Sequence, residues 1–167
     1  GVCKLSPGHT LTVRQGDSTL RPRRYWDVDF SSNGVTDEAE AGVQLMERLE
    51  EAVRIRLISD VPLGAFLSGV VYSSAVVAMM AGLNDDPVNT CSISFGDPAF
   101  NESHFASMVA ERYRTDHRVG EVSPDDFELI DRLADLYDEP YADSSAMPTY
   151  RVCELAKKRV TVALSGD

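Results

Sequence analysis

The chain has 167 residues, of which 43% are hydrophobic and 26% are charged, which is ordinary for one globular domain with a sizeable core. Its formal net charge of −11 argues against a nucleic-acid partner, because such a protein needs a basic face to neutralise phosphates. No apolar run reaches the ~18–20 residues that a membrane span needs, and no signal peptide is recognisable, so we expect no membrane partner either.

The three cysteines are Cys3, Cys91 and Cys153. Their number is odd and no CxxC pair exists, so neither a zinc site nor a disulfide framework is expected. Cys91 and Cys153 lie in apolar stretches and are interpreted as core thiols. Reduced thiols without a signal peptide predict a cytoplasmic protein.

Residues 1–35 differ in pattern from the rest of the chain. Turn residues at 7–8 and 15–17 separate short alternating runs, which predicts a β-hairpin followed by an extended linker. A small cluster of arginines at 21–24 is interpreted as a solvated face of this linker. The chain opens on Gly1 instead of methionine and stops in a small-residue turn, so we expect a fragment of a longer protein.

Residues 36–58 have the pattern of an amphipathic helix. Thr36 is the expected N-cap, and Asp37 and Glu38 suit the positive end of the helix dipole. Apolar residues recur with the helical period and predict one stripe that faces the core. These residues are Leu45, Met46, Leu49, Ala52, Val53 and Leu57.

From residue 61 onward, short apolar runs alternate with amphipathic ones. Strands are expected at 62–67, 88–95, 116–122 and 160–165. Helices are expected at 73–81, 102–113, 123–137 and 148–158. Ser123 is the expected cap of the third of these helices, with Pro124 at its first position and Asp126 closing a capping box. This order predicts an α/β fold, a parallel sheet with helices on both faces, preceded by the short hairpin and linker.

Ligands bind outside the carboxyl ends of the strands in such a sheet. That rule selects residues 68–74, 95–101, 121–123 and 165–167. The first stretch, "SGVVYSS", turns from a strand into a helix, where free amides and the helix dipole favour an anion. Ser68, Ser73 and Ser74 can donate hydroxyls, and Gly69 lets a ligand approach the backbone. By itself this pattern fits a structural turn as well as a phosphate site.

Several motifs, in order along nearly the whole chain, resemble the asparagine synthetase family. "SDVPLGAFLSGVVYSSAVVAMM" is similar to the family's PP-loop, whose motif reads Ser-Gly-Gly-(aliphatic)-Asp-Ser-Ser. "SISFGDPAFNESHFASMVAERYRTDH", "DEPYADSSAMPTY" and "VTVALSGD" resemble the second strand and helix, the substrate-side loop and the strand before the Ser-Gly-(Asp/Glu)-Gly-x-Asp-Glu signature. "LSPGHTL", with "RRYWD" further on, looks like the linker from the glutaminase domain.

The resemblance implies a fold, a domain organisation and a reaction. The fold is that of the adenine nucleotide alpha hydrolases, with 1–35 ending a glutaminase domain and 36–167 beginning the ATP-dependent synthetase domain. ATP and magnesium would be used to adenylate a carboxylate substrate, and ammonia from the glutaminase domain would then displace AMP. An apolar sheet face left uncovered after the last strand could be covered by a partner chain, such as a second copy in a homodimer.

The resemblance also assigns site residues. Ser68, Gly69, Ser73 and Ser74 match the phosphate cradle. Phe66 and Ile93 match positions near the adenosine. Ser165 and Gly166 match a backbone contact to the nucleotide, and Asp167 matches the catalytic acidic residue beside the reacting centre.

Two residues depart from the family motif. Val70 stands at the second glycine, where we expect strain from φ > 0 and crowding of the phosphate. Tyr72 stands at the aspartate that would hold magnesium, and a neutral phenol is a poor ligand for that ion, so no metal ligand is assigned. We therefore expect severe loss of ATP use. Cys3 lies in the linker and is not expected to be the glutaminase nucleophile.

Two other interpretations stay open at this point. The chain could be a non-catalytic nucleotide-binding or scaffold module with a degenerate PP-loop. Alternatively, Val70 and Tyr72 could have been introduced into an active parent.

The remaining polar residues have mostly structural interpretations. His104 is expected at the surface or as a helix cap, and the carboxylates of 125–135 as a solvated face. His117 is expected to make a structural hydrogen bond or to lie near the ribose. Residues 143–145, Asp-Ser-Ser, fit either a substrate pocket or a turn.

Overall fold

A computed structural model describes residues 3–31, 34–99, 101–123 and 128–166. The chain divides into two compact units, Gly1–Ala41 and Gly42–Asp167.

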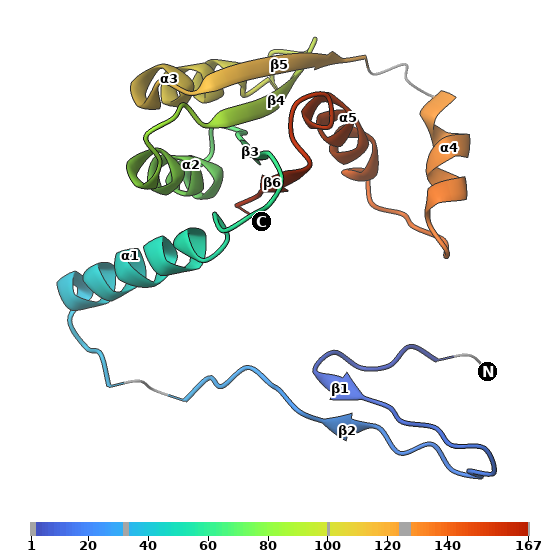
Figure 1. Cartoon of the computed structure of the whole chain (residues 1–167). Coiled ribbons are helices and arrows are strands. Elements are labelled where there is room, and N and C mark those ends of the chain that lie inside the picture. Colours follow the sequence, from blue (N-terminus) through green and yellow to red (C-terminus); the bar gives the residue numbers. More distant parts are fainter. Residues whose placement is uncertain (1–2, 32–33, 100, 124–127, 167) are drawn as a thin grey trace. The chain divides into compact units, whose positions relative to one another are not determined.

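The first unit contains the predicted hairpin. β1 (His9–Thr10) pairs antiparallel with β2 (Arg23–Arg24), and His9 lies opposite Arg24 (Figure 1). The carbonyl of Gly8 accepts hydrogen bonds from the amides of the two residues that follow β2. Gly8 has a φ of +67°, which favours glycine, and a Cβ there would collide with the backbone of Trp26. The two strands have two residues each, and most of this unit is irregular.

Four strands of the second unit form a parallel sheet in the order β5-β4-β3-β6. The strands are β3 (Leu63–Phe66), β4 (Asn89–Phe95), β5 (Asp116–Val122) and β6 (Val162–Leu164) (Figure 1). Ala65, in the middle of β3, lies opposite Thr90 on one side and Leu164 on the other. The predicted parallel sheet is therefore confirmed, with β6 as an outer strand.

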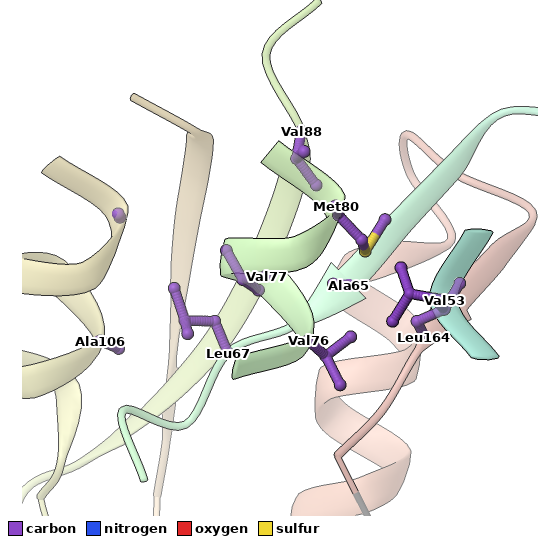
Figure 2. Close-up of a cluster of buried hydrophobic side chains, with 10 residues drawn as sticks. Val53, Ala65, Leu67, Val76, Val77, Met80, Val88, Ala106 and Leu164 are labelled. Atoms are coloured by element: carbon purple, nitrogen blue, oxygen red, sulfur yellow. The ribbon is translucent and has the colours of Figure 1, made fainter. Parts of the chain in front are cut away.

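Helices cover both faces of this sheet, as the alternation of elements predicted. One core cluster joins α1 (Glu38–Arg54), α2 (Val71–Leu83) and α3 (Ser103–Tyr113) to the strands. Figure 2 shows its centre, where Val76, Val77 and Met80 of α2 lie beside Ala65 and Leu67. A second cluster joins α5 (Ala146–Ala156) to the opposite face, and α4 (Glu128–Leu136) packs against α5.

The side-chain alternation of β3 explains the two clusters. Ala65 and Leu67 belong to the first cluster, whereas Phe66, between them, packs against the second, whose buried members are Cys91, Ala156 and Val160. Successive side chains of a strand point to opposite faces, so a continuous apolar run is what a strand covered on both faces requires.

The chain reverses its direction across the sheet at β3. The path through α2, β4 and α3 to β5 moves away from β3 on one side, and the return through α4 and α5 places β6 on the other side. Crossover connections between parallel strands are right-handed. Connections that run in opposite directions across the sheet therefore place their helices on opposite faces. It also creates a switch point between the carboxyl ends of β3 and β6, where sheets of this kind bind ligands.

The first helix differs from its prediction. It begins at Glu38 and ends at Arg54, and the carboxylate of Asp37, not Thr36, accepts the hydrogen bond from the Glu40 amide at 2.9 Å. Leu45 and Met46 are 66% and 52% exposed, so their assignment to the core was wrong. Helical periodicity identifies a stripe but does not say how much of the helix reaches the sheet. Here the contact with the core comes from Leu49 and Val53 near the end of the helix and from Leu57 just after it.

Other predictions have mixed outcomes. Cys91 is buried, but Cys153 is exposed on α5, so its assignment as a core thiol was wrong. Pro124 and Asp126, expected in a capping box, lie outside the described residues, as does part of the acidic stretch 125–135. Among the described residues, no helix is long and apolar enough to cross a bilayer.

An ion pair joins the start of β5 to the segment before β6. Arg159 Nη2 lies 2.5 Å from Asp116 Oδ2, and the two side chains are 30% and 45% exposed. The hydrogen bond from Arg159 is the main cause that holds the pKa of Asp116 below its ordinary value. The pair therefore links the segment before β6 to the start of β5.

Replacing Leu67 tests the packing at the end of β3. Leu67 is fully buried, so Leu67→Ala should lower the free energy of unfolding by about 2–5 kcal/mol, measured by denaturant unfolding with circular dichroism. Leu45→Ala removes the same atoms from a side chain that is 66% exposed and should change stability by no more than about 0.5 kcal/mol. Equal effects of the two substitutions would contradict the core described here.

Replacing Asp116 tests the ion pair through its pH dependence. Because the folded-state pKa is lowered, the pair stabilises the fold above the ordinary value of 3.8 and loses this effect as pH falls through the lowered value. Asp116→Asn should therefore be less stable than the parent at pH 7, and the difference should shrink below pH about 4. A cycle with Arg159→Met is the control, because the two changes should not be additive. A stability difference independent of pH would rule the pair out as its cause.

Candidate functional site

A cleft of about 570 Å³ lies at the carboxyl edge of the sheet, at the switch point between β3 and β6. It is bordered by the ends of β3 and β4, the first turns of α2 and α5, the residue before α3 and the loop after β6. The described lining residues are Phe66, Leu67, Ser68, Val70, Tyr72, Ser73, Cys91, Ser92, Ile93, Phe95, Glu102, Ser145, Pro148, Thr149, Val152, Ser165 and Gly166.

The turn between β3 and α2 depends on Gly69. Its φ is +88°, and a Cβ there would lie 2.6 Å from both the Ala106 nitrogen and the Phe105 Cβ. Any other residue would therefore combine backbone strain with a collision against the first turn of α3. Gly69 packs behind the turn, against α3, and is not among the residues that line the cleft.

The expectation of strain at Val70 was wrong. Val70 is the N-cap of α2, with φ −79° and ψ 166°, which is extended backbone that a β-branched residue adopts without strain. The positive φ of this turn belongs to Gly69 instead. Val70 and Tyr72 are 43% and 72% exposed, and both line the cleft. Their side chains therefore occupy the space beside the first turn of α2.

Ser73 holds the turn together from inside. Its Oγ accepts a hydrogen bond from the Ser68 amide at 3.2 Å, lies 2.8 Å from the Ser68 Oγ and donates to the Val70 carbonyl at 3.3 Å. Ser73 is only 6% exposed, so its hydroxyl is committed mainly to the loop. Ser74 is not a lining residue, and its buried hydroxyl has no hydrogen-bond partner among the described residues.

The loop after β6 approaches the same turn very closely. A Cβ at Gly166 would lie 2.5 Å from the Ser73 nitrogen and 2.6 Å from the Tyr72 carbonyl carbon. Position 166 therefore excludes every side chain, and the two loops meet backbone to backbone. Asp167, the predicted catalytic residue, lies outside the described residues.

Most of the sequence-predicted site residues lie around this one cleft. Phe66, Ser68, Ser73, Ile93, Ser165 and Gly166 line it. Gly69 packs behind the turn, and Ser74 does not line the cleft. The roles of all these residues in binding a nucleotide stay predictions.

Glu102, Pro148 and Thr149 also line the cleft, although the sequence predicted no site role for them. Glu102 comes one residue after the stretch selected at the end of β4, and its carbonyl accepts the amides of Phe105 and Ala106 at 3.0 and 3.2 Å. Glu102 would have been selected if the stretch 95–101, taken at the carboxyl end of β4, had been extended by one residue. Pro148 and Thr149 lie in the first turn of α5, within the stretch that resembles the family's substrate-side loop, and that resemblance gave neither of them a site role.

The open alternative at 143–145 has a divided answer. The Asp143 carboxylate accepts the Ser145 amide at 2.8 Å, and this bond is the main cause that lowers the Asp143 pKa. Asp143 thus has a turn role at the start of α5, while Ser145 lines the cleft.

The predicted structural hydrogen bonds of His117 are present. Its Nδ1 lies 2.9 Å from Thr90 Oγ1 and its Nε2 lies 3.1 Å from Ser92 Oγ. Burial is the main cause that lowers its pKa, which favours the neutral imidazole. His117 does not line the cleft. His104 is exposed, as expected, with its ring centroid 5.7 Å from that of Phe105.

The cleft has an unusual charge for an anion site. None of its described lining residues is basic, and Glu102 is the only carboxylate among them. No group of three or more potential metal ligands occurs among the described residues. Anion attraction would therefore depend on backbone amides at the start of α2.

A parallel sheet with a cleft at its reversal point, and a glycine- and serine-containing turn into the next helix, define an α/β domain with a candidate ligand site at its switch point. Residues 44–167 match the asparagine synthase family, and the chain belongs to that family.

Individual relatives agree with this assignment. A Methanocaldococcus jannaschii protein provisionally named asparagine synthetase (glutamine-hydrolyzing) 2 is 40% identical over 98% of this chain and 32% of its own length. Asparagine synthetase (glutamine-hydrolyzing) 1 of Bacillus subtilis is 32% identical over 99% of this chain and 26% of its own length. Amidase chry2 of Gibberella zeae is 32% identical over 100% of this chain and 28% of its own length. The chain thus spans a third or less of the length of these curated relatives.

Two solved structures align with most of this chain. The NH3-dependent NAD synthetase of Campylobacter jejuni, in complex with nitrate, has a TM-score of 0.48 at 11% identity, over 79% of this chain and 57% of that one. The phosphoadenylyl-sulfate reductase of Candida auris has a TM-score of 0.45 at 16% identity, over 80% of this chain and 70% of that one. Both scores are below 0.5, so the family assignment rests on the sequence matches.

Substituting Gly69 tests the geometry of the turn. Gly69→Ala should lower the free energy of unfolding by at least about 1–3 kcal/mol, because it combines a positive φ with a contact of 2.6 Å to backbone. Gly82→Ala, in α2 with open space around the new methyl group, should raise stability by about 0.5–1 kcal/mol. Thermal unfolding of the two variants measures both effects. A neutral Gly69→Ala would mean that the turn does not adopt this conformation.

Proposed function

We propose that this chain is part of a protein of the glutamine-dependent amidotransferase type, in which ATP activates a carboxylate and ammonia then forms the amide, and that Val70 and Tyr72 impair this reaction here. Residues 1–35 would be the end of the glutaminase domain and its linker, and 36–167 the first part of the synthetase domain. The observation that carries the proposal is the cleft at the β3–β6 switch point, bordered by the PP-loop turn and by Ser165 and Gly166 in a member of this family.

The proposed reaction has two steps. An oxygen of the carboxylate attacks the α-phosphorus of ATP, the bond to pyrophosphate breaks, and an acyl-adenylate forms. Ammonia then attacks the acyl carbon, AMP leaves, and the nitrogen loses a proton. The chain's own residues would act mainly by positioning, with Phe66 and Ile93 beside the adenosine, Ser68 and the start of α2 beside the phosphates, and Asp167 beside the reacting centre.

The described lining residues do not fit magnesium. A hard dication prefers carboxylate oxygens, and the cleft offers the carboxylate of Glu102, with the Tyr72 phenol at the position that resembles the family's metal ligand. We therefore propose that ATP use by this chain is impaired. The obstacle is the side chains of Val70 and Tyr72 and the missing charge, not backbone strain, because Val70 has an unstrained φ.

A second candidate function is a non-catalytic nucleotide-binding or scaffold module of the same family. The observation in its favour is Tyr72, which is 72% exposed and borders the cleft where a charged side chain is expected from the family motif. A cytoplasmic location and a homodimer stay predictions under both proposals.

ATP–pyrophosphate exchange in the full-length protein tests the impairment. The unmodified protein should show no exchange above background, and the double variant Val70→Gly, Tyr72→Asp should gain on the order of 10²-fold or more, because one preorganised electrostatic contact is ordinarily worth about 10²–10³ in rate. Robust exchange by the unmodified protein would overturn the impairment. No exchange by the double variant would favour the non-catalytic module. Gly82→Ala, which lies outside the cleft lining, is the control substitution and should show the same exchange as the unmodified protein.

A further inference from the structure

We propose that His117 is a positioning residue of the cleft: its hydrogen bond to Ser92 decides whether the Ser92 hydroxyl presents an acceptor or a donor to a bound ligand. The proposal rests on the proposed function in one respect, because it takes the occupant of the cleft to be a nucleotide. It goes beyond that function by giving a role to a residue that lies outside the cleft lining.

His117 belongs to a chain of hydrogen bonds that links β5 to β4. It stands opposite Thr90 in the parallel register of the two strands. Its Nδ1 lies 2.9 Å from Thr90 Oγ1, which lies 2.8 Å from Thr115 Oγ1, and its Nε2 lies 3.1 Å from Ser92 Oγ. Thr90 and Ser92 are 0% and 3% exposed, so these hydroxyls depend on one another and on the imidazole for hydrogen bonds.

Thr90 determines which ring nitrogen carries the proton of the neutral imidazole. Besides the hydroxyl contact at Nδ1, the imidazole has a hydrogen bond with the Thr90 backbone that raises its pKa. Only an acceptor favours the protonated ring, so the backbone partner is the carbonyl and the ring N–H points to Thr90. Nε2 is left with a lone pair, and Ser92 must donate to it. The Ser92 hydroxyl then offers only oxygen lone pairs to the cleft.

Protonation of His117 reverses its hydrogen bond with Ser92. An imidazolium donates from both nitrogens, so Ser92 Oγ accepts from Nε2 and its own hydrogen is released. Because Ser92 lines the cleft, that hydrogen becomes a donor for a ligand there. Burial is the largest cause that lowers the pKa of His117 below its ordinary value of 6.5, so the reversal occurs as pH falls below that value.

The charged neighbours of His117 on its own strand point to the other face of the sheet. Asp116 and Arg118 flank it on β5, and successive side chains of a strand alternate between faces. A Cβ at Gly120, which shares the face of Arg118, would lie 3.2 Å from Leu155 of α5, so α5 covers that far face. The titratable residues of β4 and α5 on the far face are Cys91, Tyr150, Arg151, Cys153 and Glu154.

On the near face, α3 packs against both β4 and β5, and its buried residues there are the small Ala106 and Ala110. Glu121 shares the face of His117 but stands opposite Ser94, further along the strands. The titratable residues of α3 and its C-cap are all exposed, namely His104, Glu111, Arg112, Tyr113 and Arg114. Burial and the bonds to Thr90 and Ser92 therefore govern the titration of His117.

Nitrogen NMR of the histidine rings in the full-length protein tests the bond to Ser92 without any ligand. The His117 signals are those lost in His117→Gln. At about pH 7.5 the ring should be neutral with its proton on Nδ1, and Ser92→Ala should shift the Nε2 resonance, because that nitrogen loses its donor. The matched control is Ser94→Ala on the same face of β4, opposite Glu121, which should leave the ring unchanged. A proton on Nε2, or equal effects of the two serine substitutions, would overturn the proposal.

Calorimetry with AMP, without magnesium, tests the effect on the cleft. AMP carries more acceptors than donors, so it gains when Ser92 becomes a donor. From about pH 7.5 to about pH 5, the affinity of the parent relative to His117→Gln should rise about 2- to 10-fold, the range that one hydrogen bond gives. Titration of the AMP phosphate is common to both proteins and cancels in this ratio. Ser92→Ala should lose the pH dependence, and His104→Gln, an exposed histidine outside the lining, should keep it.

The outcomes separate this proposal from the proposed function. A merely structural His117 would change AMP affinity equally at every pH, and that result would overturn the positioning role while leaving the nucleotide site standing. Failure of the parent to bind AMP at any pH would overturn the nucleotide site, and the ligand-free spectra would still decide whether His117 controls Ser92. Thermal melts verify that each variant folds. If His117→Gln does not fold, Ser92→Ala takes its place, because it breaks the same hydrogen bond.

Discussion

The backbone contact between two loops at the carboxyl edge of the sheet is the constraint on which the site depends. The turn after β3 and the loop after β6 meet at Ser73 and Gly166, with no space for a side chain between them. This contact is possible only because β3 and β6 are parallel neighbours, which in turn requires the chain to reverse direction after β5. The position of the cleft is thus a property of the strand order, and the side chains decide only what the cleft can hold.

Much of the fold could be predicted because each element repeats a local pattern. The strand predicted at 116–122 has the observed bounds, and the apolar run around Ala65 correctly indicated a strand covered on both faces. The failures concern information that local patterns do not contain. Leu45 and Met46 have the period of a core stripe, yet they lie on the part of α1 that does not reach the sheet. Cys153 has apolar neighbours in sequence but lies on the outer side of its helix.

The candidate site shows a similar division. A motif identifies which residues come together, since Ser68, Ser73 and Gly166 do meet at one cleft. A motif does not fix the dihedral angles. Strain was expected at Val70, but the residue of this turn that has a positive φ is Gly69. The charge of the cleft depends on how the segments assemble, because Glu102, Pro148 and Thr149 lie within family-like motifs that gave them no individual site role. The consequence is that the anomaly of Val70 and Tyr72 concerns electrostatics and shape, not backbone conformation.

The buried hydroxyl of Ser74 has a consequence for the motions of this region. Its Oγ has no hydrogen-bond partner among the described residues, and a buried polar group in that state costs about 1–3 kcal/mol. That cost is relieved whenever the first turn of α2 opens to water, so this turn should open at a lower free energy than the packed middle of the same helix around Val77 and Met80. Amide hydrogens at the start of α2 would then exchange with solvent sooner than those at its centre. The segment that borders the cleft would be the part of the helix most ready to adjust to a ligand.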